Sequence, residues 1–153
     1  MSIVDLPDEA GTAAFAARLA AVARPGDVIG LSGDLGAGKT SFARAFIRAR
    51  GGAGEVPSPT FTLVQLYELP GGAIWHFDLY RLRHPEEAWE LGIEDAFREG
   101  ISLIEWPERL GPLLPAHRLA IALDFGPGPN ARRATLTADA EWASRLAGIA
   151  AEA

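Results

Sequence analysis

The octet GDLGAGKT at residues 33–40 constrains the fold of this chain more than any other segment. It fits the spacing G-x-x-x-x-G-K-[ST], which is the Walker A pattern. The apolar residues 28–32 before it are typical of a buried strand, and residues 39–50 after it carry apolar side chains at helical spacing. Glycines let the backbone curl tightly enough to direct several N–H groups at one anion, and the following helix adds the positive end of its dipole. A strand, a glycine-rich turn and a helix in this order predict a phosphate-binding loop.

The last side chains of the octet indicate which ligand the loop holds. We expect Lys39 to contact the β- and γ-phosphates of ATP or ADP, and the Thr40 hydroxyl to coordinate Mg²⁺. Lys39 is the only lysine in a chain with 13 arginines, which favours a need for a compact ammonium at this position. The predicted nucleotide-contacting residues are Gly33, Asp34, Leu35, Gly36, Ala37, Gly38, Lys39, Thr40 and Ser41.

A nucleotide site of this kind also needs carboxylates near the metal, usually at the end of a buried strand. Asp78 ends the apolar run at residues 74–78, and Glu105 ends the run at residues 101–105. Either acid could bind the metal, and the acid bound less tightly could orient or deprotonate water. The sequence leaves the division of these roles open.

Three further side chains are candidates with two interpretations each. The turn at residues 57–60, PSPT, has a restricted backbone, so Thr60 is either a sensor of the γ-phosphate or an ordinary loop threonine. His76 shares a strand face with Asp78, and we interpret it as a packing residue rather than one that orients the acid. Trp106 is interpreted as a core or interface aromatic residue and not as a platform for base stacking.

The composition bounds the class of protein. A length of 153 residues with 48% apolar side chains suits one core, so we expect a single domain over residues 1–153. The chain has no cysteine, which excludes disulfides and thiolate metal sites and favours a reducing compartment. No signal-peptide pattern or membrane-length apolar run is visible, so we expect a cytoplasmic protein that contacts no membrane. The net charge of −6 argues that any contact with RNA is indirect.

The order of the expected elements predicts an α/β fold. Strands are expected at residues 2–6, 28–32, 61–69, 73–80, 101–104, 119–123 and 134–137. Helices are expected from residue 8, over 39–50 and 85–98, and around Trp142, Leu146 and Ile149. The short connection at residues 70–72 makes its two strands antiparallel. The sequence thus predicts a three-layer P-loop NTPase fold with a mixed sheet that is partly parallel and carries an antiparallel hairpin.

Four stretches of the sequence together resemble one protein family. They are GDLGAGKT at 33–40, SPTF at 58–61, HFDLYR at 76–81 and EWPER at 105–109. Their combination resembles the TsaE family, formerly YjeE, which is the bacterial ATPase component of the machinery that makes N6-threonylcarbamoyladenosine in transfer RNA. The resemblance covers residues from about 5 to 125, and the region that follows is less distinctive.

The resemblance implies roles for individual residues and for partner proteins. It implies that Lys39 binds phosphate, that Thr40 and Glu105 lie at Mg²⁺, that Asp78 is the acid nearby, and that Thr60 belongs to a switch-like loop. Together with Lys39, the residues Asp78, Glu105 and Thr60 form the expected catalytic set. The implied activity is a slow, partner-regulated ATPase that supports a threonylcarbamoyl transferase made of TsaD and TsaB, while TsaC makes the threonylcarbamoyl-adenylate. Contact with transfer RNA is implied to be indirect.

Two other functions remain open at the level of the sequence. A small-molecule kinase uses the same loop, although no compact arginine-rich lid is visible. A nucleotide-gated scaffold would bind its partners with hydrolysis incidental. The sequence also leaves open the adenine contacts, for which residues 126–133 are a guess, and the source of an arginine at the γ-phosphate. Arg81, Arg109 and a partner chain are the candidates for that arginine.

Overall fold

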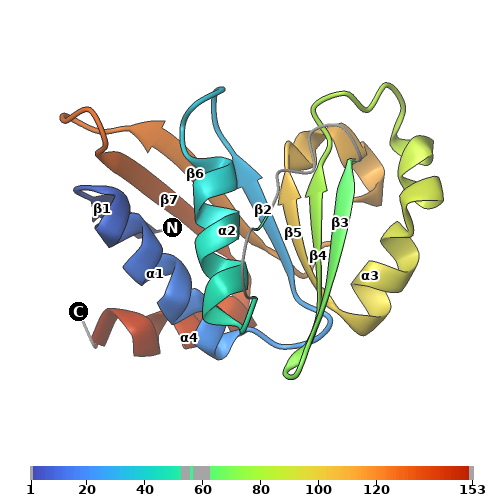
Figure 1. Ribbon diagram of the computed structural model, residues 1–153, viewed down its shortest axis with the longest axis horizontal. Coiled ribbons are helices and arrows are strands. Elements are labelled where there is room, and N and C mark those ends of the chain that lie inside the picture. The colour runs from blue at the N-terminus through green and yellow to red at the C-terminus, as the bar shows by residue number, and fades with distance from the viewer. Residues whose placement is uncertain (1, 53–55, 57–62, 152–153) are drawn as a thin grey trace.

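The computed structural model of the chain describes residues 2–52, 56 and 63–151, which form a seven-stranded sheet with helices on both faces (Figure 1). The strands are β1 (Ser2–Leu6), β2 (Val28–Ser32), β3 (Val64–Leu69), β4 (Gly72–Asp78), β5 (Ile101–Glu105), β6 (Leu119–Phe125) and β7 (Arg132–Ala138). The helices are α1 (Glu9–Val22), α2 (Lys39–Ala49), α3 (Ile93–Glu99) and α4 (Ala140–Ala151), with 3₁₀ helices η1 (Pro85–Leu91) and η2 (Pro107–Leu113). Among the described residues, no helix combines the length and apolarity that a membrane crossing needs.

The strand order β1-β7-β6-β2-β5-β4-β3 confirms the predicted mixed sheet. Strands β6, β2, β5 and β4 are parallel, and β3 pairs with β4 as the predicted antiparallel hairpin. At the other edge β7 is antiparallel to both β6 and β1. The carboxyl ends of the parallel strands meet at one edge of the sheet, where β2 leads into the octet and where Asp78 pairs with Glu105 in register.

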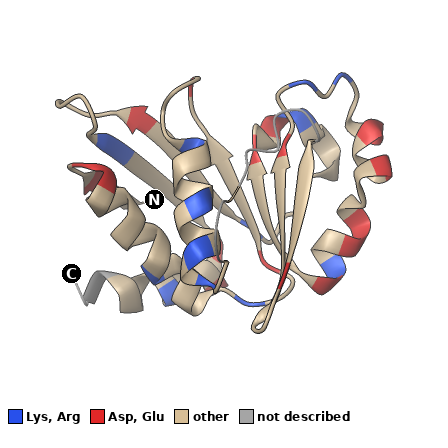
Figure 2. Ribbon diagram, in the orientation of Figure 1, with Lys and Arg blue, Asp and Glu red and all other residues tan. Residues whose placement is uncertain are grey.

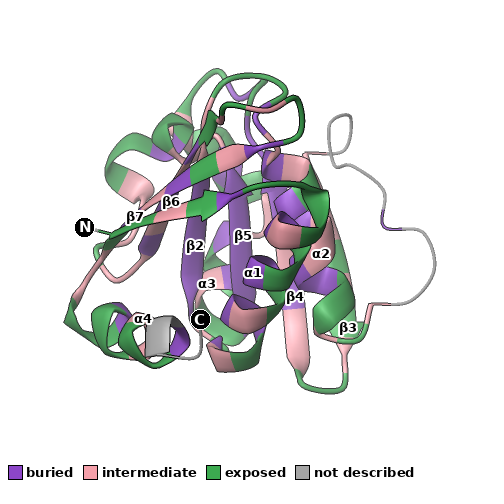
Figure 3. Ribbon diagram, turned by 90° about the vertical axis from the view of Figure 1, so that its left-hand side faces the viewer, coloured by how far each residue is buried: buried purple, intermediate pink, exposed green. Residues whose placement is uncertain are grey.

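Successive residues of the central strands point to opposite faces and build two cores. Ile29 and Leu31 of β2 join the core under α1, α2 and α4, whereas Val28 joins the core under η1, α3 and η2. Figure 3 shows β2 and β5 buried along their lengths between these layers. A strand that is covered on both faces has a continuous run of apolar residues, so β2 and β5 could both be predicted from the sequence.

The structure lengthens the predicted strands at 119–123 and 134–137 to β6 and β7, and it differs from the predicted elements more clearly in three other places. The expected helix over 85–98 is divided into η1 and α3 at Gly92, whose φ of 80° interrupts the helix. Strand β4 ends at Asp78 and not at Tyr80, because the Asp78 side chain accepts the Tyr80 N–H at 3.2 Å and turns the chain out of the sheet. Helix η2, which begins at Pro107, was not predicted.

Helix α4 is held to the sheet by an ionic cluster at the end opposite the octet. Asp139 accepts the Trp142 N–H at 2.9 Å as a helix cap and is also bonded to His117 Nδ1. Arg145 donates to the buried Asp27 at 2.6 Å. The hydrogen bond that His117 donates to Asp139 raises the pKa of His117, while the hydrogen bonds from the Trp142 N–H and then from His117 lower the pKa of Asp139.

We predict that His117→Gln destabilises the protein more in mild acid than in alkali. Because the folded-state pKa of His117 is raised above 6.5, its contribution is complete below that pH and is lost as the pH rises through the folded value. Asp139, with its lowered pKa, remains ionised in this window. Urea unfolding of both proteins at about pH 5.5 and about pH 9 measures the difference. An equal difference in unfolding free energy at both pH values would contradict the prediction.

Candidate functional site

The octet forms a tight loop, the glycine loop (residues 33–40), between β2 and α2. Its three glycines adopt positive φ angles, 140° at Gly33, 82° at Gly36 and 100° at Gly38. The Ala37 N–H donates to the Asp34 carbonyl at 3.0 Å and closes the turn. These backbone conformations strain other residues, so the glycine spacing in the sequence follows directly from the shape of the loop.

Lys39 lies at the centre of the glycine loop and is buried, with 5% of its surface exposed. Its Nζ donates to the carbonyls of Gly33 at 2.6 Å and Asp34 at 2.9 Å, and lies 4.3 Å from the ring centre of Trp106. Burial lowers the pKa of Lys39, and the carboxylate of Glu105 opposes this most strongly. The ammonium is therefore a partly desolvated positive charge near the N-terminus of helix α2.

Glu105 is held between two side chains in a buried hydrogen-bond chain. Thr40 Oγ1 donates to Glu105 Oε1 at 2.8 Å, and His76 Nε2 lies 2.7 Å from Glu105 Oε2. His76 is fully buried, and its Nδ1 has no partner among the described residues. A neutral imidazole that donates from Nε2 satisfies the carboxylate without leaving a buried N–H unpaired.

The interpretation of His76 as a packing residue is therefore wrong, since its ring fixes one oxygen of Glu105. The parallel pairing of β4 and β5 explains the contact, because it places His76 opposite Leu103, two residues before Glu105 on the same face. Trp106 does pack against the core as a partly buried residue, and its ring also makes a cation–π contact with Lys39.

One cavity of about 390 Å³ brings together residues that the sequence singled out on three separate segments. It is lined by Leu35, Gly36, Gly38, Lys39, Thr40, Ser41, Asp78, Tyr80, Arg81, Glu105, Trp106 and Arg132. Gly33 and Asp34 are connected to this cavity because their carbonyls accept hydrogen bonds from Lys39, which lines it. Thr60, the remaining predicted catalytic residue, lies outside the described residues.

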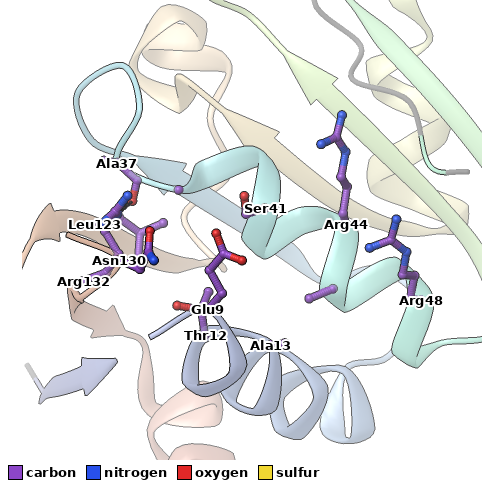
Figure 4. Close-up of a pocket in the computed structure, with 12 residues that line it drawn as sticks. Glu9, Thr12, Ala13, Ala37, Ser41, Arg44, Arg48, Leu123, Asn130 and Arg132 are labelled. Atoms are coloured by element: carbon purple, nitrogen blue, oxygen red, sulfur yellow. Dashed lines mark hydrogen bonds between the residues drawn. The ribbon is translucent and has the colours of Figure 1, made fainter. Parts of the chain in front are cut away.

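A second cavity of about 300 Å³ adjoins the first between α1, α2 and the loop from β6 to β7 (Figure 4). Glu9 and Thr12 of α1 and Asn130 of the loop line it, and it shares Gly38, Ser41 and Arg132 with the first cavity. One lysine and two arginines occur along α2, and basic residues are visible along this helix in Figure 2. The two cavities together suit an elongated ligand whose anionic end lies at the glycine loop and whose polar end lies between α1 and α2.

Sequence reasoning missed the residues on α1 and Arg132. Arg81 does line the first cavity, whereas the Arg109 guanidinium carbon lies 5.9 Å from the Tyr80 ring centre. Arg132 lies within residues 126–133, the segment offered for the adenine, but no sequence pattern distinguishes it from its neighbours. Glu9 and Thr12 carry no motif, because only the packing of α1 against α2 brings them to the cavity.

We predict that Gly33→Ala destabilises the protein far more than Gly26→Ala. An added Cβ at Gly33 would lie 2.4 Å from the Leu123 carbonyl oxygen, whereas a Cβ at Gly26, at φ 95°, meets nothing within 4 Å. The control should cost about 1–2 kcal/mol for its backbone conformation alone, and Gly33→Ala more than about 3 kcal/mol. Urea unfolding measures both, and equal costs would show that the Gly33 contact carries no strain.

Comparisons with known proteins identify the family of the chain and support its fold. The sequence model of the family described as "Threonylcarbamoyl adenosine biosynthesis protein TsaE" matches residues 6–134. The tRNA threonylcarbamoyladenosine biosynthesis protein TsaE of Rickettsia bellii is 44% identical over 119 residues, which are 77% of this chain and 83% of the relative. The protein of the same name from Bacillus subtilis is 40% identical over 133 residues, 86% of this chain and 81% of the relative.

A solved structure is similar over nearly the whole chain. The crystal structure of YdiB from Bacillus subtilis superposes with a TM-score of 0.82 at 31% sequence identity, covering 99% of this chain and 95% of that one. The family match spans the glycine loop, both strand-end acids and the segment up to β7. The chain therefore belongs to the TsaE family of tRNA threonylcarbamoyladenosine biosynthesis proteins.

Proposed function

We propose that this protein is an ATPase that binds Mg-ATP in the first cavity and supports threonylcarbamoylation of transfer RNA through TsaD- and TsaB-type partners. The observation that carries the proposal is the hydrogen-bond chain from Thr40 through Glu105 to the buried His76. Thr40 and Glu105 line the same cavity as Lys39. A hydroxyl, a carboxylate and an ammonium placed around a glycine loop are the groups that a metal-bound triphosphate requires.

The oxygen ligands in the cavity suit Mg²⁺. Thr40 and Glu105 are already within hydrogen-bond distance of each other, and Asp78 lines the same cavity. Within the described residues no three His, Cys, Asp or Glu side chains form a metal site of their own. That is the expected arrangement for Mg²⁺, which usually takes one or two protein ligands and completes its shell with phosphate oxygens and water. Bound there, Mg²⁺ would neutralise charge on the phosphates.

The protein's own groups have separate tasks in this proposal. Lys39 exchanges its contacts with the loop carbonyls for phosphate oxygens and supplies positive charge. His76 keeps the Glu105 carboxylate in one orientation, so that Thr40 and Glu105 meet the metal together. Asp78, at the adjacent strand end, orients or deprotonates the attacking water. Trp106 covers the ammonium and excludes solvent from it.

The second cavity would take the nucleoside. It begins at Ser41 and Gly38, where the glycine loop passes into α2, and continues to polar side chains that can bond a base or a ribose. Glu9 offers a carboxylate acceptor, and Asn130 offers both a donor and an acceptor. A ligand that spans both cavities thus places its phosphates at the loop and its nucleoside between α1 and α2.

The partner role draws support from the family and from exposed apolar side chains around the first cavity. Leu35 of the glycine loop, Phe125 at the end of β6 and Tyr80 are all exposed large apolar or aromatic residues. Such residues at the rim of a site are typical of a surface that another protein covers. The same proposal includes a cytoplasmic location, which the cysteine-free sequence favours.

We predict that Glu105→Gln lowers the rate of Mg-dependent ATP hydrolysis by about 10² or more, because an amide replaces the charge beside the metal. Glu86→Gln is the matched control, since Glu86 is exposed on η1, is not among the groups that shift the pKa of Lys39, and differs by the same single charge. Release of inorganic phosphate measures both variants. Equal rates in the two variants would contradict a role for Glu105 in hydrolysis. Transfer of phosphate to a metabolite would identify a kinase instead.

We also predict that TsaD- and TsaB-type proteins from the same source raise the rate of ATP hydrolysis. The reason is that a partner seated over Leu35 and Phe125 would complete the exposed side of the site. Phosphate release is measured with each partner alone and with both, and Lys39→Ala provides the background without nucleotide binding. If Glu105→Gln supports full transfer-RNA modification, the protein is a nucleotide-gated scaffold whose hydrolysis is incidental.

A further inference from the structure

Arg132, the first residue of β7, ties the glycine loop to the loop that precedes β7. Its Nε donates to the Ala37 carbonyl at 3.0 Å, and its Nη2 donates to the Gly36 carbonyl at 3.2 Å. Its Nη1 donates to the carbonyls of Ala131 at 2.8 Å and Pro129 at 3.3 Å. One guanidinium therefore holds backbone oxygens of two segments that lie far apart in the sequence.

The carbonyls that Arg132 holds determine where the loop's N–H groups point. The Gly36 carbonyl shares a peptide group with the Ala37 N–H, and the Ala37 carbonyl shares one with the Gly38 N–H. In a planar trans peptide the C=O and N–H bonds point in opposite directions. Holding both carbonyls from outside the turn therefore directs both N–H groups toward its inner side, where the Ala37 N–H donates to the Asp34 carbonyl.

The side chain of Arg132 is itself fixed by its surroundings. Its guanidinium carbon lies 5.0 Å from the ring centre of Phe125. The Arg132 side chain also packs against the glycine loop, since a Cβ added at Gly38 would lie in ordinary contact with it, 3.6 Å from Nε. Arg132 also lines both cavities, at the point where a ligand would pass from one to the other.

We propose that Arg132 is a positioning residue of the nucleotide site: it holds the Gly36 and Ala37 carbonyls so that the glycine loop keeps its turn, closed by the Ala37 N–H, and presents the Gly38 N–H to the phosphates. The inference rests on the proposed function for the identity of the anion and on the contacts above for the role. A planar, forked donor is needed, because the two carbonyls belong to successive peptides and are bonded by different nitrogens. A lysine at this position would keep the charge and lose the bridge.

The next residue provides a matched control. Arg133 carries the same charge, is exposed, and donates through Nε to Asp5 at 2.9 Å on the opposite face of β7. We expect Arg132→Gln and Arg132→Lys each to weaken binding of ATP and ADP by about tenfold, and Arg133→Gln to leave it unchanged. Binding is measured with a fluorescent nucleotide and by calorimetry. Thermal unfolding checks that all variants remain folded.

Amide exchange tests the role without any nucleotide. The Ala37 N–H should exchange at least tenfold faster in Arg132→Gln than in Arg133→Gln, because its bond to the Asp34 carbonyl depends on the held peptide. Full nucleotide affinity in Arg132→Lys would overturn the proposal, as would equal losses in both Gln variants or unchanged Ala37 exchange. If the wild-type chain binds no nucleotide, the proposed function fails, while Ala37 exchange still decides whether Arg132 positions the loop.

Discussion

The parallel register of β2, β5 and β4 is the constraint on which the candidate site depends. It places Leu31 opposite Glu105 and Glu105 opposite Asp78, so three strand ends meet beside the glycine loop. A slip of one residue would turn Glu105 to the other face of the sheet, and a slip of two would move it by about 6.6 Å. The 2.8 Å bond between Thr40 and Glu105 exists only in the observed register. The apolar residues of the two cores fix that register, and the chemistry of the site follows from it.

At this edge of the sheet, two opposite charges, those of Glu105 and Lys39, are buried close together. Glu105 is 2% exposed and Lys39 is 5% exposed, so both charges have lost most of their water. A buried carboxylate is tolerated when hydrogen bonds replace the lost solvent, and Thr40 and His76 supply them. In such surroundings each electrostatic contact is stronger than it would be in water. The burial that lowers the stability of the fold therefore also strengthens the electrostatic attraction of these groups for an anion and its metal.

The sequence revealed the parts of the site whose geometry is local, and it missed the parts that depend on distant packing. The glycine spacing encodes the φ angles of a single turn, and an acid at the end of an apolar run marks the edge of the sheet, so both could be predicted. The contact of His76 with Glu105 depends on the relative register of two strands, which no local pattern encodes. Arg132 reaches the Ala37 carbonyl across 95 residues, and an arginine at the start of an edge-side strand has no signature of that role.

Trp106 shows how a rule of local conformation gives way at the site. A tryptophan before a proline is expected to be extended, yet Trp106 has φ 61° and ψ 52°, a left-handed conformation that costs about 1–2 kcal/mol. The conformation places its ring over Lys39 and against Tyr80, at 4.9 Å between ring centres.

The packing of the next residue shows what holds the strained backbone in place. A Cβ on Gly30, in the middle of buried β2, would lie 3.1 Å from the Pro107 ring, so this glycine admits the proline against the strand. The Trp106 N–H also donates to the Leu31 carbonyl at 3.2 Å. Both contacts fasten the segment after β5 to β2, on each side of the left-handed residue. A glycine that weakens a central strand thus serves the site, because the chain it accommodates carries the aromatic ring that covers the buried ammonium.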